Sequence, residues 1–127
     1  MSEEYRDKQV RFCFTVIGRN NTQNDRYLKS LKSILMQNYT NYHIVFVDDF
    51  SSDNTMKLAM DYLIESNFPK DRIKFIKNKK RTYATYNIIN AAFNYCHEDD
   101  VQVRFDGDDL LIGRNVLGLV NAEYQKN

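Results

Sequence analysis

Short apolar runs alternate with segments of helical periodicity along the whole chain, and this alternation restricts the fold more than any other feature. The run VRFCFTVIG at 10–18 is rich in β-branched and aromatic residues and closes on a glycine, which is typical of a strand. The run YHIVFVDD at 42–49 is almost continuously apolar, as expected of a strand buried on both faces. The pattern predicts strands at 10–18, 42–49, 72–77 and 100–105, and helices at 25–37, 56–66, 82–96 and 115–125.

Strands that alternate with helices form βαβ units, whose right-handed crossovers place helices on both faces of a parallel sheet. The sequence therefore predicts an α/β fold with a Rossmann-like, mainly parallel sheet of about four strands. The chain has 127 residues, of which 43% are hydrophobic and 28% charged, and it fits one globular domain over 1–127.

Charge and hydropathy limit the functional class. Eighteen Lys and Arg residues against 17 Asp and Glu leave a net charge of +1, which argues against a general nucleic-acid-binding role. Residues 1–10 lack the apolar core of a signal peptide, and no apolar stretch approaches the length of a membrane span. We therefore expect a cytoplasmic protein.

The only cysteines are Cys13, in a strand-like run, and Cys96, at the end of a helix-like run. This arrangement favours two buried or half-buried thiols in a reducing compartment over a disulfide scaffold. The sequence contains no CxxC pair and no clustered set of His and Cys residues that would suggest zinc.

Polar residues follow each expected strand, and open parallel sheets bind ligands beyond the carboxyl ends of their strands. The last strand is followed by DGDD, in which Asp106, Asp108 and Asp109 offer hard oxygen ligands suited to Mg²⁺ or Mn²⁺. Gly107 between them permits a tight turn. Taken alone, the same cluster could equally cap the following helix in solvent.

The other strand ends also allow two interpretations. The basic segment NKKR at 78–81 could meet a diphosphate, with Arg81 as a bidentate ligand, or could be a solvated loop. Asp48 and Asp49 could accept hydrogen bonds from a nucleobase or ribose, or could cap a helix, although SSD at 51–53 already offers caps. The convergence of all these groups on one edge is more informative than any single motif.

Several segments together resemble family 2 glycosyltransferases, which use sugar nucleotides and have the GT-A fold. VIGRNN at 16–21 is similar to the first strand and polar turn of that family, and SILMQNYTNYHIVFVDDFSSDNT at 33–55 to its helix, turn, strand and acidic signature. NKKRTYATYNIINAA at 78–92 and VRFDGDDLL at 103–111 resemble its later Asn-containing segment and its D-x-D-D strand end. Order and spacing match over nearly the whole chain.

The resemblance implies that the strand ends bind the donor nucleotide. Asp49, with Asp48 beside it, would recognise the base and ribose, and Arg81 would lie near the base or diphosphate. UDP-sugars are the commonest donors of the family. The implied donor-binding residues are Gly18, Arg19, Asn21, Asp48, Asp49, Arg81, Asn87 and Asp106.

The resemblance also implies a divalent metal, Mn²⁺ or Mg²⁺. Asp106 and Asp108 would form the D-x-D pair that contacts this metal, with Asp109 supporting them. The metal would neutralise charge on the departing nucleoside diphosphate while the sugar passes, with inversion, to an unknown acceptor that could be a glycan, a protein or a lipid.

The chain departs from the family pattern in three respects. Residues 18–21 read GRNN where many members have Pro-Thr-Tyr-Asn, and Arg81 occupies a place often held by glycine. The chain stops one helix after the D-x-D motif, so it is expected to be truncated relative to a full GT-A domain, and no residue matches the usual catalytic base. An alternative is a non-catalytic or incomplete sugar-nucleotide-binding module, completed by another chain or by self-association, or limited to slow donor hydrolysis. An uncovered sheet edge or apolar surface would favour a homo-oligomer.

Two other nucleotide or phosphate proteins fit poorly. A phosphoacceptor receiver domain needs an acid pair near its start and a lysine at a late strand end, whereas this chain has its first acid pair at 48–49 and no lysine after DGDD until Lys126. A P-loop nucleotidase needs GxxxxGK[ST], which the sequence lacks.

Overall fold

The computed structural model describes residues 9–126. Its strands are β1 (Phe12–Gly18), β2 (Tyr42–Asp48), β3 (Ile73–Lys77) and β4 (Val101–Asp106), all parallel, in the order β3-β2-β1-β4. The predicted α/β fold with a four-stranded parallel sheet is therefore confirmed. Observed and predicted bounds of the strands differ by at most two residues at either end.

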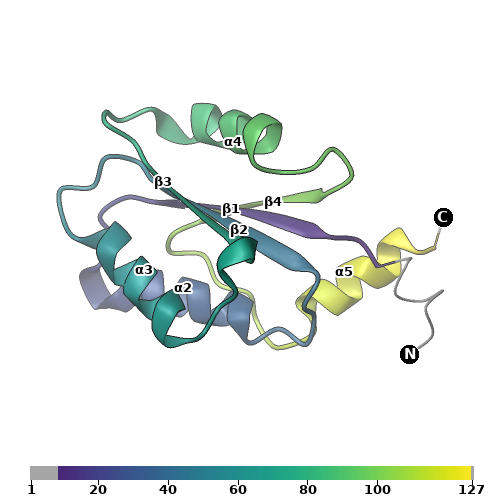
Figure 1. Ribbon diagram of the computed structural model, residues 1–127. Coiled ribbons are helices and arrows are strands. Elements are labelled where there is room, and N and C mark those ends of the chain that lie inside the picture. The colour runs from purple at the N-terminus through teal and green to yellow at the C-terminus, as the bar shows by residue number, and fades with distance from the viewer. Residues whose placement is uncertain (1–8, 127) are drawn as a thin grey trace.

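Helices cover both faces of the sheet, as predicted (Figure 1). The helices α2 (Arg26–Leu35) and α3 (Thr55–Glu65) pack on one face, and α4 (Tyr83–Asn94) packs on the other (Figure 1). The last helix, α5 (Val116–Tyr124), lies near the amino end of the sheet, and two short 3₁₀ turns occupy Gln23–Asp25 and Lys70–Arg72. No helix in the described part of the chain has the length and hydropathy to cross a membrane.

Successive side chains of each strand point to opposite faces of the sheet, so each face has its own core. The two cores differ in size. Phe12, Phe14 and Val16 of β1 point toward α2 and α3 and belong to a large aromatic and aliphatic core. The opposite face buries a much smaller cluster, made of Cys13, Val45, Val47 and Ala91 under α4. The outer surface of α4 is correspondingly rich in exposed apolar groups, namely Tyr83, Tyr86, Ile89 and Phe93.

The two cysteines form a disulfide, so the prediction of two free thiols is wrong. Cys13 points toward the α4 face, and the chain leaves α4 directly above it, which brings Cys96 to a Cα–Cα distance of 6.0 Å although 83 positions separate the two residues. His43 and Asp100 lie beside the same sulfur atoms, so the expectation that no His and Cys residues cluster is wrong for the folded chain. The cytoplasmic location stays a prediction.

The strand order places a topological switch point between β1 and β4. From β1 the chain steps outward to β2 and β3, and it then returns by way of α4 to add β4 on the other side of β1. Both the loop that leaves β1 and the loop that leaves β4 run to the α2 side of the sheet, where the backbone N–H of Leu111 donates to the Ser33 hydroxyl at 3.1 Å. In open parallel sheets, the carboxyl ends of the strands at such a switch point are where ligands bind.

Candidate functional site

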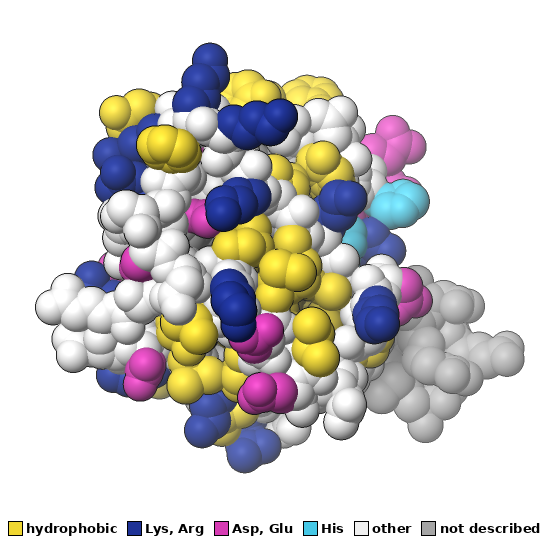
Figure 2. Space-filling model, turned by 60° about the vertical axis from the view of Figure 1, so that its left-hand side comes forward, with side chains coloured by type: hydrophobic (Ala, Val, Ile, Leu, Met, Phe, Trp, Pro, Cys, Tyr) yellow, Lys and Arg dark blue, Asp and Glu magenta, His cyan; other side chains and the backbone are white. Residues whose placement is uncertain are grey.

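The ends of the four strands are aligned along one edge of the sheet, on the left in Figure 1. The backbone N–H of Asp49 donates to the carbonyl of Gly18 at 2.9 Å, and that of Gly107 donates to the carbonyl of Ile17 at 2.8 Å. The backbone N–H of Asn78 donates to the carbonyl of Asp48 at 2.9 Å. Figure 2 turns this side forward and shows lysine and arginine side chains spread around a central group of hydrophobic ones, with acidic side chains between them.

The acidic cluster at the end of β4 forms a closed turn with outward carboxylates. The carboxylate of Asp109 accepts the backbone N–H of Asp106 at 2.9 Å, and the backbone N–H of Asp109 donates to the Asp106 carbonyl at 2.9 Å. Asp106, Asp108 and Asp109 each offer one oxygen, and these oxygens lie within 4.8 Å of one another. Half-exposed or exposed hard oxygens in this arrangement fit Mg²⁺ or Mn²⁺, which keep positions open for substrate phosphates.

Asn21 fills the space between the β1 and β4 loops. Its Oδ1 accepts the backbone N–H of Arg19 at 2.6 Å and packs against Gly18 and Gly107. A Cβ at Gly107 would lie 2.5 Å from this oxygen and 3.1 Å from the Cα of Gly18, so any larger residue there would force Asn21 or the Gly18 backbone to move. The predicted donor ligand Asn21 is thus buried and holds the two loops in register.

Asp49 holds the loop that leads into α4. Its Oδ1 accepts the backbone N–H of Thr82 at 2.8 Å and the amide of Asn78 at 3.1 Å, and its Oδ2 accepts the backbone N–H of Tyr83 at 2.9 Å. Burial acts to raise the pKa of Asp49, but these hydrogen bonds outweigh burial and hold the pKa below its usual value. Only 3% of Asp49 is exposed. Because its carboxylate accepts the backbone N–H groups of Thr82 and Tyr83, it caps the first turn of α4.

Asp48 and Asn87 are also buried in contacts with the loops. The Oδ1 of Asp48 accepts the backbone N–H of Ser51 at 3.1 Å and a short hydrogen bond from the Ser51 hydroxyl. The Oδ1 of Asn87 accepts the amide of Asn78 at 2.9 Å and the hydroxyl of Thr82 at 2.7 Å. The Nδ2 of Asn87 is buried without a partner among the described residues.

The basic groups of this edge remain exposed. The Arg81 guanidinium stacks over the Tyr83 ring, 4.4 Å from its centroid, while Lys79 and Lys80 project from the same loop. Arg19 is exposed on the neighbouring β1 loop. These basic side chains are accessible to an anionic ligand. The carboxylates of Asp48 and Asp49, in contrast, are buried.

Asn20, which was not among the predicted site residues, helps to connect the β1 and β2 loops. The backbone N–H of Asn20 donates to the Ser51 hydroxyl at 3.0 Å, and the Asn20 Oδ1 accepts the backbone N–H of Ser52 at 2.9 Å. The backbone N–H of Asn21 donates to the Thr55 hydroxyl at 3.0 Å. Asn20 has a φ of 53°, a left-handed conformation that asparagine tolerates better than most residues, and the two adjacent asparagines were the available signal.

The predicted site residues thus lie along one edge of the sheet. Asp48 and Asp49 leave β2 and the acidic cluster leaves β4, so β1 separates them by about 10 Å, twice the spacing of neighbouring strands. The predicted donor-binding residues Gly18, Arg19, Asn21, Asp48, Asp49, Arg81, Asn87 and Asp106 all lie on strand ends, on the loops that leave them or in the first turns of α4.

A model of the family described as glycosyl transferase family 2 matches residues 19–123. The chain belongs to this family. The matched region contains the acidic cluster, the Asp48–Asp49 pair and the loop before α4, so the family assignment covers the same residues as the geometry.

Two relatives of this family 2 chain cover most of it. The Bacillus subtilis (strain 168) protein named "Putative glycosyltransferase EpsE" is 36% identical over 91 residues, which are 69% of this chain and 30% of the relative. A Mycoplasma genitalium protein named as an uncharacterized glycosyltransferase is 30% identical over 117 residues, which are 81% of this chain and 39% of the relative. The chain therefore spans about a third of the length of these relatives.

Solved structures show that the fold is that of GT-A glycosyltransferases. A mannosyltransferase from Pyrobaculum calidifontis, in complex with GDP-Man and Mn²⁺, matches with a TM-score of 0.73 at 23% identity and covers 91% of this chain and 32% of its own. S. aureus TarS matches with a TM-score of 0.72 at 19% identity and covers 92% of this chain and 33% of its own.

Proposed function

We propose that this family 2 domain binds a nucleoside-diphosphate sugar, with a UDP-sugar as the first candidate, and presents it for inverting transfer to a glycan, protein or lipid acceptor. The observation that carries the proposal is the cluster of Asp106, Asp108 and Asp109, three converging carboxylates beside the topological switch point. The complex of the structural neighbour with GDP-Man and Mn²⁺ supports it.

Asp106 and Asp108 would hold Mn²⁺ or Mg²⁺, and Asp109 would fix the turn through its hydrogen bond to the Asp106 backbone. When bound, the metal supplies positive charge that stabilises the leaving diphosphate. The chain itself supplies the rigid turn around Gly107 and the exposed guanidinium groups of Arg19 and Arg81, which suit bidentate phosphate contacts.

The base and ribose would lie toward β2 and the loop before α4. A ligand that reaches from the end of β2 to the acidic cluster must span roughly 10 Å along the sheet edge. A nucleoside diphosphate, with a base at one end and phosphates at the other, is such a ligand. Asp49 would act mainly by holding Thr82 and Tyr83 in place, because three backbone and side-chain donors already occupy its Oδ1 and one occupies its Oδ2.

A donor-binding module without transfer activity of its own is the second candidate. It is favoured by the carboxylates at the strand ends: Asp48 and Asp49 are buried in loop hydrogen bonds, and the other three belong to the metal cluster. None of these five is therefore available as a separate base for an acceptor hydroxyl. Such a module would need another chain or a second copy, or would only hydrolyse donor slowly.

The test is binding of a panel of nucleotides and nucleotide sugars, each with and without Mn²⁺, measured by thermal shift and calorimetry. Asp108→Ala should weaken metal-dependent donor binding by at least about 10–100-fold, the range seen when a group that only supports a metal ligand is lost. Asp71→Ala, which removes an exposed acid far from this edge, is the matched control and should bind as wild type.

Equal metal-dependent affinity in Asp108→Ala and wild type would contradict the proposed metal site. Donor binding without sugar release or transfer, across a set of acceptors, would favour the second candidate. Release of free sugar alone would identify slow hydrolysis.

A further inference from the structure

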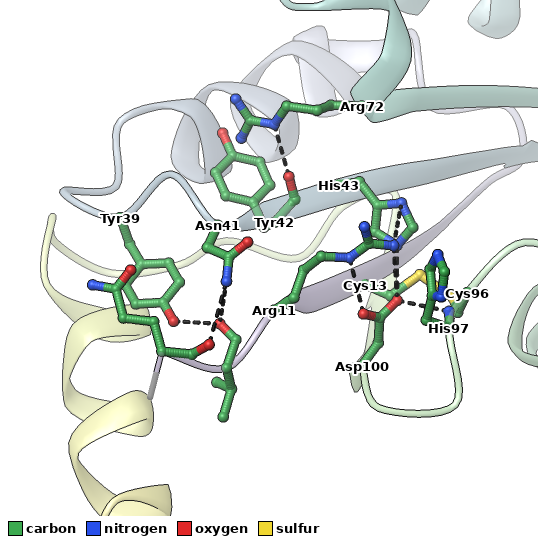
Figure 3. A network of polar contacts seen from close by, with 12 residues as sticks. Arg11, Cys13, Tyr39, Asn41, Tyr42, His43, Arg72, Cys96, His97 and Asp100 are labelled. Carbon is green, nitrogen blue, oxygen red and sulfur yellow. Dashed lines mark hydrogen bonds and ion pairs between the residues drawn. A yellow bond between two sulfur atoms is a disulfide. The ribbon is translucent and has the colours of Figure 1, made fainter. Parts of the chain in front are cut away.

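A second cluster of metal-binding side chains lies at the amino end of the sheet, opposite the edge described above. Cys13 of β1, His43 of β2 and Cys96 and Asp100 of the α4–β4 loop converge there (Figure 3). One ligand atom from each residue lies within 4.8 Å of the other three. Cys13 is fully buried, and the side chains of Asp100 and His43 are only 2% and 14% exposed.

We propose that these four residues bind one Zn²⁺ when the Cys13–Cys96 disulfide is reduced. Two thiolates, one imidazole nitrogen and one carboxylate oxygen form a four-coordinate set of the type that zinc prefers, and thiolate ligands select zinc over Mg²⁺ or Mn²⁺. This inference does not depend on the proposed donor binding.

The distances suit a tetrahedral site. Zinc–sulfur and zinc–nitrogen bonds of about 2.3 and 2.0 Å place neighbouring ligand atoms roughly 3–4 Å apart, within the observed spread of the cluster. Only the two bonded sulfur atoms are too close together. Once the bond between them is broken, rotation about the Cα–Cβ bonds of Cys13 and Cys96 separates the sulfurs while the Cα atoms stay 6.0 Å apart.

Arg11 completes the charge balance of the proposed site. Two thiolates and one carboxylate around Zn²⁺ leave one net negative charge, which a neighbouring guanidinium can neutralise in a poorly hydrated place. The Nε of Arg11 lies 2.9 Å from the Oδ1 of Asp100, and its Nη2 lies 3.2 Å from the Nε2 of His43. The backbone N–H of His97 also donates to Asp100 at 2.8 Å, so the carboxylate is oriented from two sides (Figure 3).

The chemistry makes the disulfide and the metal mutually exclusive. A dithiol reductant delivers two electrons and two protons to the sulfur–sulfur bond, which yields two protein thiols and converts the reductant to its own disulfide. Binding of Zn²⁺ then displaces both thiol protons into solvent. A small-molecule disulfide that takes two electrons from the two thiolates restores the Cys13–Cys96 bond and releases the metal, and it is itself reduced to two thiols.

The site is separate from the acidic cluster. Cys13 pairs with His43 in the parallel register, whereas Gly18 pairs with Asp48, so the two sites are separated by five strand positions. At about 3.3 Å per residue, the distance along the strands is roughly 16 Å.

Cobalt(II) is the probe, because thiolate–cobalt charge transfer and tetrahedral d–d bands report bound sulfur and are not produced by a site made only of carboxylates. The full chain, reduced with a phosphine and kept under anaerobic conditions, should bind one Co²⁺ with both spectral features. Excess Zn²⁺ should displace the cobalt, and the oxidised chain should show neither feature. Circular dichroism should show that the reduced chain stays folded.

His43→Gln is the decisive variant because it retains both cysteines, and it should lower cobalt affinity at least 10-fold and alter the d–d bands. His97→Gln is the matched control, since the chain has only two histidines and only the backbone of His97 contacts Asp100. Its cobalt spectrum should be unchanged. Absence of thiolate–cobalt absorption in the reduced chain, unfolding of that chain with or without metal, or identical spectra for His43→Gln and wild type would each overturn the proposal.

Discussion

The two ends of the same four strands are organised by different interactions. At the carboxyl end, side-chain oxygens of Asp48, Asp49 and Asn21 accept hydrogen bonds from backbone N–H groups of the loops, while the acidic cluster remains open to solvent. At the amino end, a disulfide and a half-buried ion pair between Arg11 and Asp100 connect the start of β1 to the α4–β4 loop. The carboxyl end thus leaves three carboxylates accessible to solvent, whereas the amino end links two segments that are far apart in the sequence. Perturbing each end in turn tests this division.

Removing the disulfide should have the largest effect on stability. The chain-entropy estimate for a loop of this length is roughly 4–5 kcal/mol, and measured losses for native disulfides are about 2–5 kcal/mol. Cys96→Ser should therefore lower the free energy of unfolding in urea by about 2–5 kcal/mol relative to oxidised wild type. Mn²⁺-dependent donor binding at the other end should persist. Equal urea midpoints for oxidised and reduced wild type, without metal, would contradict the assigned role of the disulfide.

Asp49→Ala should have the next largest effect, and it should act on both stability and binding. The substitution leaves the backbone N–H groups of Thr82 and Tyr83 without their acceptor, and an unpaired buried donor costs roughly 1–3 kcal/mol. We expect a loss of about 2–3 kcal/mol, with weaker nucleoside binding even without metal. Asp71→Ala should stay within about 0.5 kcal/mol of wild type. An unchanged nucleoside affinity would place the base elsewhere.

Gly107→Ala should disturb the loops at the carboxyl end more modestly. The new methyl group would overlap the Asn21 side chain and press on the Gly18 backbone, and overpacking of this kind costs roughly 1–3 kcal/mol. Gly118→Ala is the control, because a Cβ there meets nothing within 4 Å and alanine favours the α5 helix by about 0.5–1 kcal/mol. The two alanine variants should thus shift the melting temperature in opposite directions.

Acid should lower the free energy of unfolding through protonation of Asp49. This effect should be the smallest of the four, because it reflects only the difference in the proton affinity of Asp49 between the folded and the unfolded chain. Its folded pKa lies below the ordinary 3.8, so the folded chain binds fewer protons than the unfolded chain in that range. The associated stability is complete above about pH 5 and is lost as pH falls through 3.8 toward the folded pKa. Asp49→Asn should show a shallower acid dependence of its urea midpoint. A slope equal to that of wild type would refute the assignment.

The carboxyl end could be predicted from the sequence because its residues directly follow the strands. Hydrophobic runs located the strands, and parallel topology then required that DGDD and the Asp48–Asp49 pair share one edge. The roles of individual side chains were harder to predict. Asp49 caps α4, a helix that begins 34 residues later, and such a partner is set by the strand order and not by local sequence.

The amino end could not be predicted because its residues meet only in three dimensions. Arg11 precedes β1, His43 lies within β2 and Asp100 precedes β4, so no local spacing connects them. Cys13 and Cys96 looked like independent buried thiols because their approach depends on how α4 returns across the sheet. Side-chain alternation in β1 assigns Cys13 to that face, but it does not specify which residue of the returning chain lies above it.

The disulfide also determines what a protease would release. Residues 13–96 form a covalently closed loop that contains three of the four strands and every helix except α5. A single cut inside this loop leaves both pieces joined under oxidising conditions, and they separate on a gel only after reduction. A cut between Cys96 and Val101 leaves β4, α5 and the acidic cluster with no covalent link to the rest of the chain, so this piece separates on a denaturing gel without reduction. Limited proteolysis with and without reductant therefore maps the closed loop directly.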